Sequence, residues 1–350
     1  MSNTKPRPVT IKDVAVAAGV SYATVSRVLN DYQHVRPDKR QRVLEAMEHL
    51  GYTVNLQARS LAGGRSHVIG LLVHDLRNPY SAHVIEGIDE VLVDAEYELI
   101  LHTTHRRRKK EAAYVNTLTK GLIDGLILLL PLESSEYLEQ LHERRFPYVV
   151  ITDHEHFDDY SPVVGTNNWQ GAYQATRYLL ELGHRRIGFL TGLPEFRSAQ
   201  ERLDAFQAAH ADAGVHLDNA YIAPGNFNQK SGYESAGILL DLPAPPTAIF
   251  AANDPSAFGA YDAARERGLR IPDDLSLVGF DDVTQAAYMH PPLTTVRQPM
   301  LTMGRLAAQM LLQRIAAPER PAARMVIQSE LVVRGSCAPP VGSLSMPTAQ

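Results

Sequence analysis

Apolar positions in the first fifty residues recur at intervals of three and four, which predicts helices over residues 10–19, 21–30 and 37–51. Thr10 and Asp13 have the spacing of a capping box at the start of the first helix, and Ser21 is placed to cap the second. Gly19 breaks the chain between these two helices. Two short helices joined by a tight glycine turn, with a third helix after them, predict a helix-turn-helix unit.

The second of these helices has two different faces. Val25 and Val28 share one face, which we expect to be core. The opposite face is short, polar and aromatic, and consists of Tyr22, Ala23, Ser26 and Arg27. A surface of this kind can read base edges in a major groove. It therefore favours a DNA-binding unit over the alternative of a generic three-helix bundle.

From residue 68 onward the pattern changes to short apolar runs that alternate with helical stretches. We expect strands at residues 68–73, 97–101, 125–130, 148–151, 163–165, 186–191, 248–251 and 275–279. Between them we expect helices at residues 80–95, 108–120, 168–182, 199–213, 230–240 and 254–267. This alternation predicts parallel sheets with helices on both faces. The number of strands favours two α/β lobes over a single sheet.

Charge is divided unevenly along the chain. The 350 residues carry a formal net charge of −5, and their 45% hydrophobic and 21% charged residues are ordinary for a globular protein. These values argue against disorder, collagen and a coiled-coil rod. Residues 1–65 hold ten Lys and Arg against five Asp and Glu, whereas the rest of the chain holds 24 against 34. A basic head on an acidic body indicates a nucleic-acid-binding module joined to another function.

The sequence also argues against several locations and site types. The single cysteine, Cys337, excludes a disulfide framework and a cysteine-based zinc site, and we expect it to be an exposed thiol. No apolar signal segment opens the chain, and the longest apolar run, residues 126–132, is too short to span a bilayer. We therefore expect a soluble, cytoplasmic protein with no membrane partner.

An enzyme is the main alternative of a different class. The chain lacks glycine-rich phosphate loops and the G-x-S-x-G and H-E-x-x-H motifs. His154 and His156 have no evident third ligand, so we expect neither a metal site nor a cofactor. The basic run at residues 106–110 is expected to be a solvated helix face. The headpiece and the missing signal argue against a free-standing solute-binding protein.

Six segments carry a resemblance to the lactose-repressor (LacI/GalR) family of transcriptional regulators. They are VTIKDVAVAAGVSYATVSRVLN (residues 9–30), VRPDKRQRVLEAMEHLGYTVN (35–55), ARSLAGGRSHVIGLL (58–72), LGHRRIGFLTG (182–192), ANDPSAFGAYDAARERGLRIPDDLSLVGFDD (252–282) and PPLTTVRQP (291–299). The resemblance covers about residues 8–336. The full set in this order is much more specific than any one segment.

The resemblance implies an all-α helix-turn-helix headpiece with a hinge helix, and an α/β two-lobed body like the type I periplasmic sugar-binding proteins. It implies a homodimer that binds palindromic double-stranded operator DNA, with joined headpieces gaining effective concentration. We place the headpiece at residues 1–54, the hinge helix and linker at 55–66, the sensor domain at 67–336 and a disordered tail at 337–350. The N-lobe would comprise residues 67–166 and 296–322, and the C-lobe 167–292 and 325–336, with crossovers near 166–168, 292–296 and 321–326.

The resemblance also assigns roles on the headpiece and hinge. Tyr22 and Ala23 fall where the family discriminates most among operators, and Arg27 can contact guanine with two hydrogen bonds. Leu61 would enter the minor groove as an apolar wedge, the alternative being ordinary packing. Further contacts, mainly to phosphates and the hinge, are expected from Thr10, Ser21, Thr24, Ser26, Asn30, Asn55, Ala58 and Arg59.

Ligands of open α/β sheets bind at the carboxyl ends of the strands, where several polar residues of this chain fall. With the family's pattern, this position predicts effector contacts from His74, Tyr80, Asp153, Arg202, Phe227, Asn253, Asp281 and Gln298. Asp254 is expected to cap its helix, and Asp75 and Asp282 are expected to be structural.

These residue types suit a sugar. Carboxylates, amides and an arginine fork can bind many hydroxyls, while an aromatic ring stacks on the apolar face of a pyranose. We therefore predict a repressor whose operator affinity is controlled allosterically by a sugar or glycoside. The alternatives are a nucleobase or other metabolite acting as a corepressor and, from a different class, an α/β enzyme or a solute-binding protein. The residues leave open whether the effector weakens or strengthens operator binding.

Overall fold

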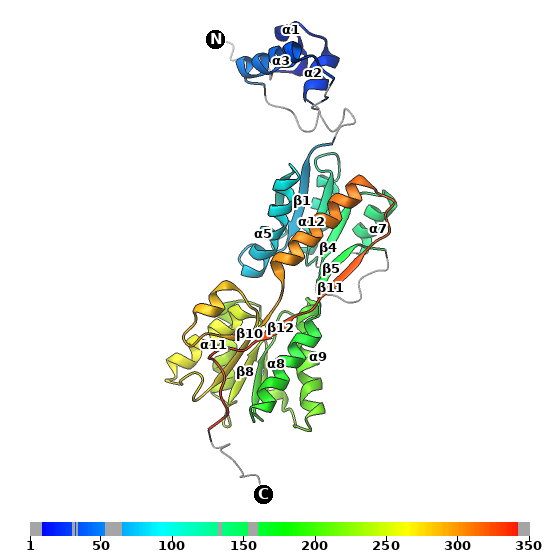
Figure 1. Ribbon diagram of the computed structural model, residues 1–350. Coiled ribbons are helices and arrows are strands. Elements are labelled where there is room, and N and C mark those ends of the chain that lie inside the picture. The colour runs from blue at the N-terminus through cyan, green and yellow to red at the C-terminus, as the bar shows by residue number, and fades with distance from the viewer. Residues whose placement is uncertain are drawn as a thin grey trace, which may run out of the picture. The chain divides into compact units, whose positions relative to one another are not determined.

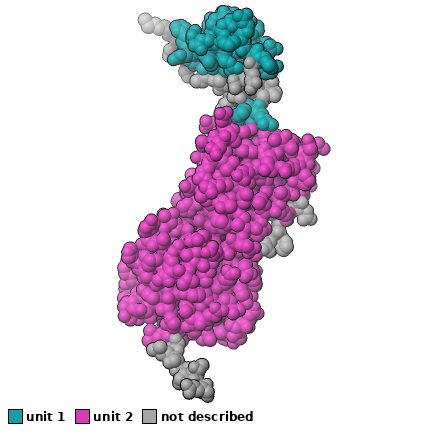
Figure 2. Space-filling model, in the orientation of Figure 1, with its two compact units in different colours: residues 1–67, 120–124 teal, residues 68–119, 125–350 magenta. Residues whose placement is uncertain are grey.

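The computed structural model describes residues 9–29, 32, 34–52, 65–131, 135–152 and 160–341. The chain divides into two compact units, which Figure 2 distinguishes by colour. The headpiece unit comprises residues 1–67 with 120–124, and the body comprises residues 68–119 with 125–350. None of the helices in the described ranges is long and apolar enough to cross a membrane.

Three helices form the described part of the headpiece: α1 (Ile11–Ala18), α2 (Tyr22–Leu29) and α3 (Pro37–Leu50). The backbone N–H and the hydroxyl of Thr10 both donate to the Asp13 carboxylate, at 2.8 and 2.7 Å, which fixes the start of α1. Gly19 adopts a left-handed φ of 62° and ends that helix. Val14, Val25 and Val43 from the three helices are fully buried against one another. The predicted helix-turn-helix architecture is confirmed.

The N-lobe of the body contains a six-stranded parallel sheet in the order β11-β5-β4-β3-β1-β2. Its strands are β1 (Val68–Val73), β2 (Glu98–Thr103), β3 (Gly125–Leu129), β4 (Tyr148–Ile151), β5 (Val163–Thr166) and β11 (Arg324–Ile327). Its helices are α5 (Pro79–Asp94), α6 (Arg108–Leu118), α7 (Ser135–Glu143) and α12 (Met300–Ala316). The helices α5 and α12 pack against each other over one face of the sheet (Figure 1).

The C-lobe contains a second six-stranded sheet in the order β12-β10-β9-β8-β6-β7, in which only the β10–β12 pair is antiparallel. Its strands are β6 (Ile187–Leu190), β7 (Ile222–Ala223), β8 (Ala248–Ala251), β9 (Ser276–Asp281), β10 (Thr294–Arg297) and β12 (Glu330–Val332). Its helices are α8 (Asn168–Glu181), α9 (Arg197–Asp212), η1 (Asn219–Tyr221), α10 (Gln229–Leu240), α11 (Asp254–Glu266) and η2 (Thr284–Tyr288).

Alternation along the C-lobe strands produces two cores. Phe189 and Phe250 point to the face covered by α8 and α9, whereas Leu190 and Ile249 point to the face covered by α10 and α11. Successive strand residues face opposite sides of a sheet, so strands buried on both faces read as continuous apolar runs. This explains why the apolar runs located most of the central strands.

Two of the predicted crossovers between the lobes were misplaced. The strand β10 pairs with β9 in the C-lobe sheet, so the second crossover lies at residues 298–299 and not at 292–296. The strand β11 pairs with β5 in the N-lobe sheet, so the third crossover lies at residues 328–329. Residues 325–327 therefore belong to the N-lobe, and residues 294–297 belong to the C-lobe.

Residues 337–338, which the prediction placed in a disordered tail, are packed against the C-lobe. The N–H of Ala338 donates to Ser276 Oγ at 3.0 Å, and its carbonyl accepts from the same hydroxyl at 3.0 Å. Cys337 is half-buried, with its thiol 3.1 Å from the Leu277 carbonyl, and burial raises its pKa to about 11. The exposed thiol expected from its place near the chain end was therefore wrong.

Candidate functional site

The helix α2 presents the face that the sequence predicts for DNA. Val25 and Val28 are buried in the headpiece core, whereas Tyr22 is 49% exposed and Arg27 is also exposed. Ser21 Oγ accepts a hydrogen bond from Thr24 N at 3.2 Å, which fixes the start of the helix. The other exposed or partly exposed residues on the predicted DNA surface are Thr10, Ser21, Ala23, Thr24 and Ser26.

The predicted hinge contacts Asn55, Ala58, Arg59 and Leu61, together with Asn30, lie outside the described residues. Close to where the hinge was predicted to end, Ser66 N and Oγ donate to Asp124 Oδ1 at 2.7 and 2.8 Å, and His67 N donates to Oδ2 at 2.9 Å. These bonds secure the chain immediately before β1.

A cavity of about 440 Å³ lies between the two lobes of the body. We call it the interlobe cavity. The N-lobe contributes residues that follow β1, β2 and β3, and the C-lobe contributes residues near the ends of β6, β8, β9 and β10. It is lined by His74, Asn78, Tyr80, Arg106, Leu130, Phe196, Ser198, Arg202, Phe227, Asn253, Asp281 and Gln298.

Seven of the eight predicted effector residues line this cavity, and the eighth, Asp153, lies outside the described residues. Sequence reasoning missed Asn78, Leu130, Phe196 and Ser198, and it assigned Arg106 to a solvated basic run. That assignment was wrong, because Arg106 is the third residue after β2 and lies at the same sheet edge as His74. Extending the strand-end rule to β2 would have found it.

A buried network surrounds Asp281. Gln298 Nε2 donates to Asp281 Oδ1 at 2.6 Å, and Arg202 Nη2 lies 3.8 Å from the same oxygen. Arg202 is 4% exposed and donates through Nε and Nη2 to Asn168 Oδ1, at 3.1 and 2.7 Å. It also donates to the Ala252 carbonyl. Asn168 and the Ala252 carbonyl therefore hold Arg202 in place, and its charge compensates that of Asp281 nearby.

Asp254 lies next to this network. The sequence predicted that it caps α11, but Asn253 is the cap residue and accepts a hydrogen bond from Ser256 N. Asp254 is fully buried, and its oxygens accept from Val283 N at 2.8 Å and from Thr295 Oγ1 at 2.5 Å. Burial, and then the charge of nearby Asp281, raise the pKa of Asp254 well above its ordinary value. Through its two hydrogen bonds, Asp254 holds the loop that follows β9.

Backbone strain is concentrated at the cavity. Arg106, Leu130, Phe227 and Asp281 have φ angles of 59°, 50°, 53° and 114°, in the left-handed region that non-glycine residues rarely adopt. Such conformations persist where the surrounding structure enforces them, and they cluster at binding sites. The strain therefore supports a functional role for the cavity independently of its lining chemistry.

The two lobes are in direct contact around the cavity. Arg106 Nη1 donates to Asn226 Oδ1 of the C-lobe at 2.6 Å. The His74 and Phe196 rings lie 4.8 Å apart. His83 Nε2 and Thr284 Oγ1 lie 3.3 Å apart.

Asp75 is structural, as predicted. The Arg77 guanidinium hydrogen-bonds its carboxylate and lowers its pKa to about 2, and Arg106 lies 3.5 Å away. Asp282 is likewise paired with Arg297 and Arg334, at 2.7 Å in each case. No cluster of His, Cys, Asp and Glu suited to a metal ion occurs within the described part of the chain.

Comparison with known proteins separates the same two parts. Residues 10–55 match the family described as bacterial regulatory proteins, lacI family, and residues 176–337 match the periplasmic binding protein-like domain. The HTH-type transcriptional repressor PurR of Edwardsiella ictaluri is 37% identical over 330 residues, covering 94% of this chain and 97% of that protein. The HTH-type transcriptional regulator DegA of Bacillus subtilis is 36% identical over 333 residues, covering 94% and 98%.

Solved structures are similar over the same length. The crystal structure of the lac repressor dimer bound to operator and the anti-inducer ONPF is 28% identical, with a TM-score of 0.81. The alignment covers 95% of this chain and all of that one. The transcriptional regulator CelR in complex with cellobiose is 32% identical, with a TM-score of 0.70, and covers 94% of this chain and all of that one.

Proposed function

Since the chain belongs to the lacI family of bacterial regulatory proteins and is a DNA-binding transcriptional regulator rather than an enzyme, we propose that a carbohydrate in the interlobe cavity controls its affinity for operator DNA. The observation that carries this proposal is the convergence of hydrogen-bonding groups and aromatic rings from both lobes on one cavity.

The chemistry of the cavity suits a neutral, hydroxyl-rich ligand. Asp281 offers a carboxylate oriented by Gln298, and Gln298 Oε1 is a buried acceptor with no protein partner among the described residues. Arg106 Nε is a buried donor that likewise has no protein partner among the described residues. One arginine and one carboxylate of the lining are already paired, Arg202 with Asp281, which disfavours a highly charged ligand. A hydroxyl both donates and accepts hydrogen bonds, so the hydroxyls of a ligand can pair with the Asp281 carboxylate, with Gln298 Oε1 and with Arg106 Nε.

Aromatic rings form the apolar side of the site. The Phe196 and Phe227 rings lie 6.0 Å apart and nearly perpendicular. A Cβ atom at Gly192 would lie 1.9 Å from the Phe227 ring, so only glycine there leaves room for it. A pyranose can lay its C–H face against such a ring. A nucleobase can stack there too and remains the second candidate.

Control of DNA binding follows from the position of the cavity between the lobes. A ligand that contacts both lobes favours the lobe arrangement that those contacts require, and it acts only through its different affinity for two arrangements. By linkage, operator DNA must change effector affinity by the same factor. We place the regulator in the bacterial cytoplasm, on the nucleoid when operator is bound.

A thermal-unfolding screen of the full-length protein tests the proposed effector class. The probes are cellobiose, ribose, glucose and galactose, with adenine, guanine and hypoxanthine as the competing class. A binding probe raises the Tm in proportion to the logarithm of its concentration. The proposal predicts a rise with at least one sugar. A rise with purine bases alone would reject the carbohydrate and support the nucleobase.

On the DNA side, we propose that α2 enters the major groove, with Tyr22, Ala23 and Arg27 facing base edges. Thr10, Ser21, Thr24, Ser26 and Asn30 would position the headpiece on phosphates. In the hinge, Leu61 would act as the minor-groove wedge, supported by Asn55, Ala58 and Arg59.

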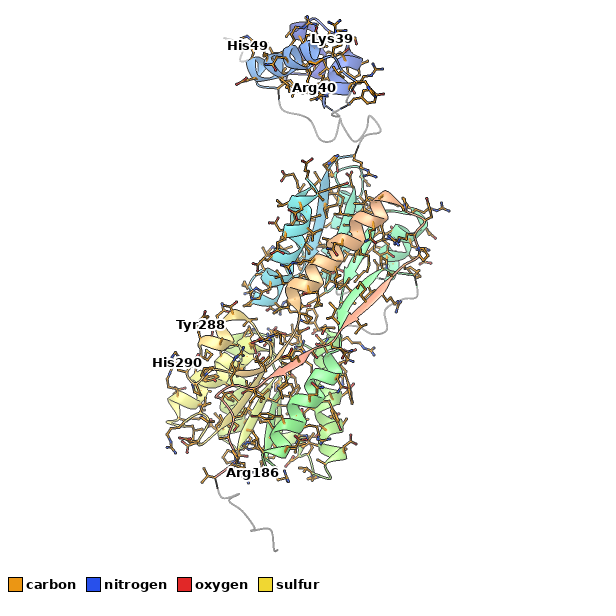
Figure 3. The ribbon with its side chains drawn as sticks, viewed as in Figure 1. Lys39, Arg40, His49, Arg186, Tyr288 and His290 are labelled. Atoms are coloured by element: carbon orange, nitrogen blue, oxygen red, sulfur yellow. The ribbon has the colours of Figure 1, made fainter. Side chains whose placement is uncertain are left out.

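We propose that the regulator is a homodimer joined through a groove beside α11, of about 1010 Å³. Tyr288 and His290 line it and lie close together on the C-lobe (Figure 3). Tyr288 is 74% exposed. Asp262 and Arg265, which pair with each other at 2.6 Å, line the same groove, and a two-fold axis through it would make the interface self-complementary. Light scattering should find a dimer that Tyr288→Asp converts to monomer. A monomeric wild type, or an intact Tyr288→Asp dimer, would contradict this interface.

A further inference from the structure

The N-lobe contains a second, smaller pocket with about 170 Å³ of empty space, its open mouth included, which we call the N-lobe chamber. Its walls come from the carboxyl ends of β1 and β3, from the residue after β2 and from the first turn of α6. His74 and Leu130 line both the chamber and the interlobe cavity. The two cavities therefore adjoin each other at His74 and Leu130.

Buried polar groups face the chamber. Thr104 is 1% exposed, and its Oγ1 has no hydrogen-bond partner in the described part of the chain. Glu111 is 2% exposed, and its carboxylate accepts a hydrogen bond from the Tyr137 hydroxyl. A buried hydroxyl without a partner is rare in folded proteins, because it loses the hydrogen bonds that water gave it. Thr104 therefore points to a group that completes the chamber.

Strained backbone occurs at Leu130, which lines the chamber, and in the loop that directly follows Thr104. His105 and Arg106 are consecutive non-glycine residues with left-handed φ angles of 50° and 59°, and Leu130 has a φ of 50°. Thr104 N donates to the Val73 carbonyl at 2.9 Å, and Arg106 N donates to the His74 carbonyl at 3.2 Å. These bonds tie the loop after β2 to the end of β1. The loop beside the chamber is thus held in a costly conformation, as at ligand sites.

The chemistry of the walls defines the group that fits. A carboxylate accepts hydrogen bonds, and a threonine hydroxyl accepts or donates. Val73, Leu128 and Leu129 supply an apolar surface around them. A short arm with one methylene and a terminal donor, a hydroxymethyl or aminomethyl group, meets both requirements.

We propose that the N-lobe chamber is a second compartment of the effector site and takes a hydrogen-bond-donating arm of the effector past His74. The proposal rests on the proposed function, because it assigns the interlobe cavity to an effector. The same donor chemistry can come from a trapped water molecule, and the experiment separates these two sources.

Methyl NMR on the full-length protein, labelled at Leu and Val methyl groups, tests the chamber without knowledge of the effector. Val73, Leu128 and Leu129 report on the chamber, and Leu239 and Leu277 in the C-lobe core serve as controls. The probes are methanol and methylammonium, which donate, and acetate, which only accepts. We expect saturable shifts of the chamber methyls with at least one donor probe, and none with acetate.

Thr104→Val removes the hydroxyl but keeps the shape, and it should weaken the donor probe at least fivefold. Thr117→Val, on the exposed side of α6, is the matched control and should leave the titration unchanged. Chamber methyls that respond to no donor probe, or that respond equally in Thr104→Val, would overturn the proposal and leave the chamber to water.

The same variants separate this proposal from the proposed function. A sugar found in the thermal screen should bind wild type at least tenfold more tightly than its counterpart lacking the terminal hydroxyl, as glucose against 6-deoxyglucose. Thr104→Val should remove this difference, and its persistence in the variant would overturn the arm assignment. If no sugar raises the Tm, the carbohydrate effector fails, while the methyl titration still decides the chamber.

Discussion

At the scale of single residues, Asp281 and Asp282 are neighbours whose carboxylates have different surroundings. Asp281 lines the interlobe cavity beside Gln298, whereas Asp282 is held by Arg297 and Arg334. Two adjacent carboxylates thus allow a matched test in which the same change is made inside and outside the site.

Asp281→Asn should weaken binding of a sugar identified in the thermal screen by about 10- to 100-fold, because a charged acceptor is replaced by a neutral amide. Asp282→Asn should lower stability and leave sugar affinity within about threefold of wild type. Isothermal titration of both variants measures this. Equal losses in the two variants would mean that Asp281 acts only through the fold.

His184 contacts the segment near the end of the chain and makes the stability of the protein depend on pH. It is 1% exposed, its Nδ1 lies 2.8 Å from Thr247 Oγ1, and its Nε2 lies 3.0 Å from the Ala338 carbonyl. Burial lowers its pKa to about 4. A depressed folded-state pKa means that this contribution to stability is complete above pH 6.5 and is lost as the pH falls toward 4.

We expect wild type to lose about 3 kcal/mol of unfolding free energy through His184 over that interval. His184→Gln should show a correspondingly flatter decline in urea unfolding between pH 6.5 and 4. Parallel pH profiles for the two proteins would contradict the assignment.

At the scale of elements, α5 and α12 approach each other through glycines. A Cβ atom at Gly304 would lie 2.1 Å from the Val84 carbonyl oxygen, and one at Gly87 would lie 2.1 Å from the Leu301 carbonyl oxygen. Both clashes involve backbone, which cannot move aside as a side chain can. The close contact of these helices positions the N-lobe half of the cavity.

Gly304→Ala should therefore lower the unfolding free energy by about 2–3 kcal/mol through overpacking. Gly214→Ala is the control: it has a left-handed φ of 64° and no atom within 4 Å of the place a Cβ would take, so it should cost about 1 kcal/mol. Denaturant unfolding compares them, and an equal cost for both would argue against the close helix contact.

The helix α2 carries the element-scale prediction for DNA. Arg27→Ala should reduce the preference for a selected operator over random DNA by about 5- to 100-fold, as expected for loss of a guanine contact. Lys39→Ala, on α3 (Figure 3), should leave that preference unchanged. Fluorescence anisotropy with both DNAs at several salt concentrations measures this. A change in salt slope alone would make Arg27 a phosphate contact.

Prediction from sequence succeeded where an apolar run marks a buried strand and a polar residue follows directly after it. Buried parallel strands gave continuous apolar runs, and His74, Asn253 and Asp281 follow such runs, so their convergence was predictable. The short strands β7, β10, β11 and β12 were missed. Three of them, β7, β11 and β12, are edge strands, which carry weaker apolar patterns, as in the largely exposed β11; the fourth, β10, has only four residues, two of them threonines. Their absence misplaced two crossovers.

Other features depend on contacts between distant segments. The Arg106–Asn226 bond joins residues 120 positions apart, and the pairing of Asp254 with Val283 and Thr295 brings together three separate segments. Neither has a local signature. The N-lobe chamber likewise depends on where Thr104 and Glu111 meet the ends of β1 and β3.

At the scale of the whole molecule, the basic head and acidic body assign opposite tasks to the two units. Residues 1–65 carry the excess of Lys and Arg, which suits docking on phosphates, whereas the body carries the excess of Asp and Glu. The acidic body should contribute little to attraction for DNA, and under the proposed function effector occupancy controls DNA binding through the headpieces.

Operator affinity measured with and without effector tests this account most directly. An operator is selected from random DNA with the full-length protein, and anisotropy then gives its Kd with and without saturating sugar from the thermal screen. The account predicts at least a fivefold change of Kd in wild type and a much smaller one, at the same sugar concentration, in Asp281→Asn. An operator Kd that the bound sugar leaves unchanged in wild type would contradict it.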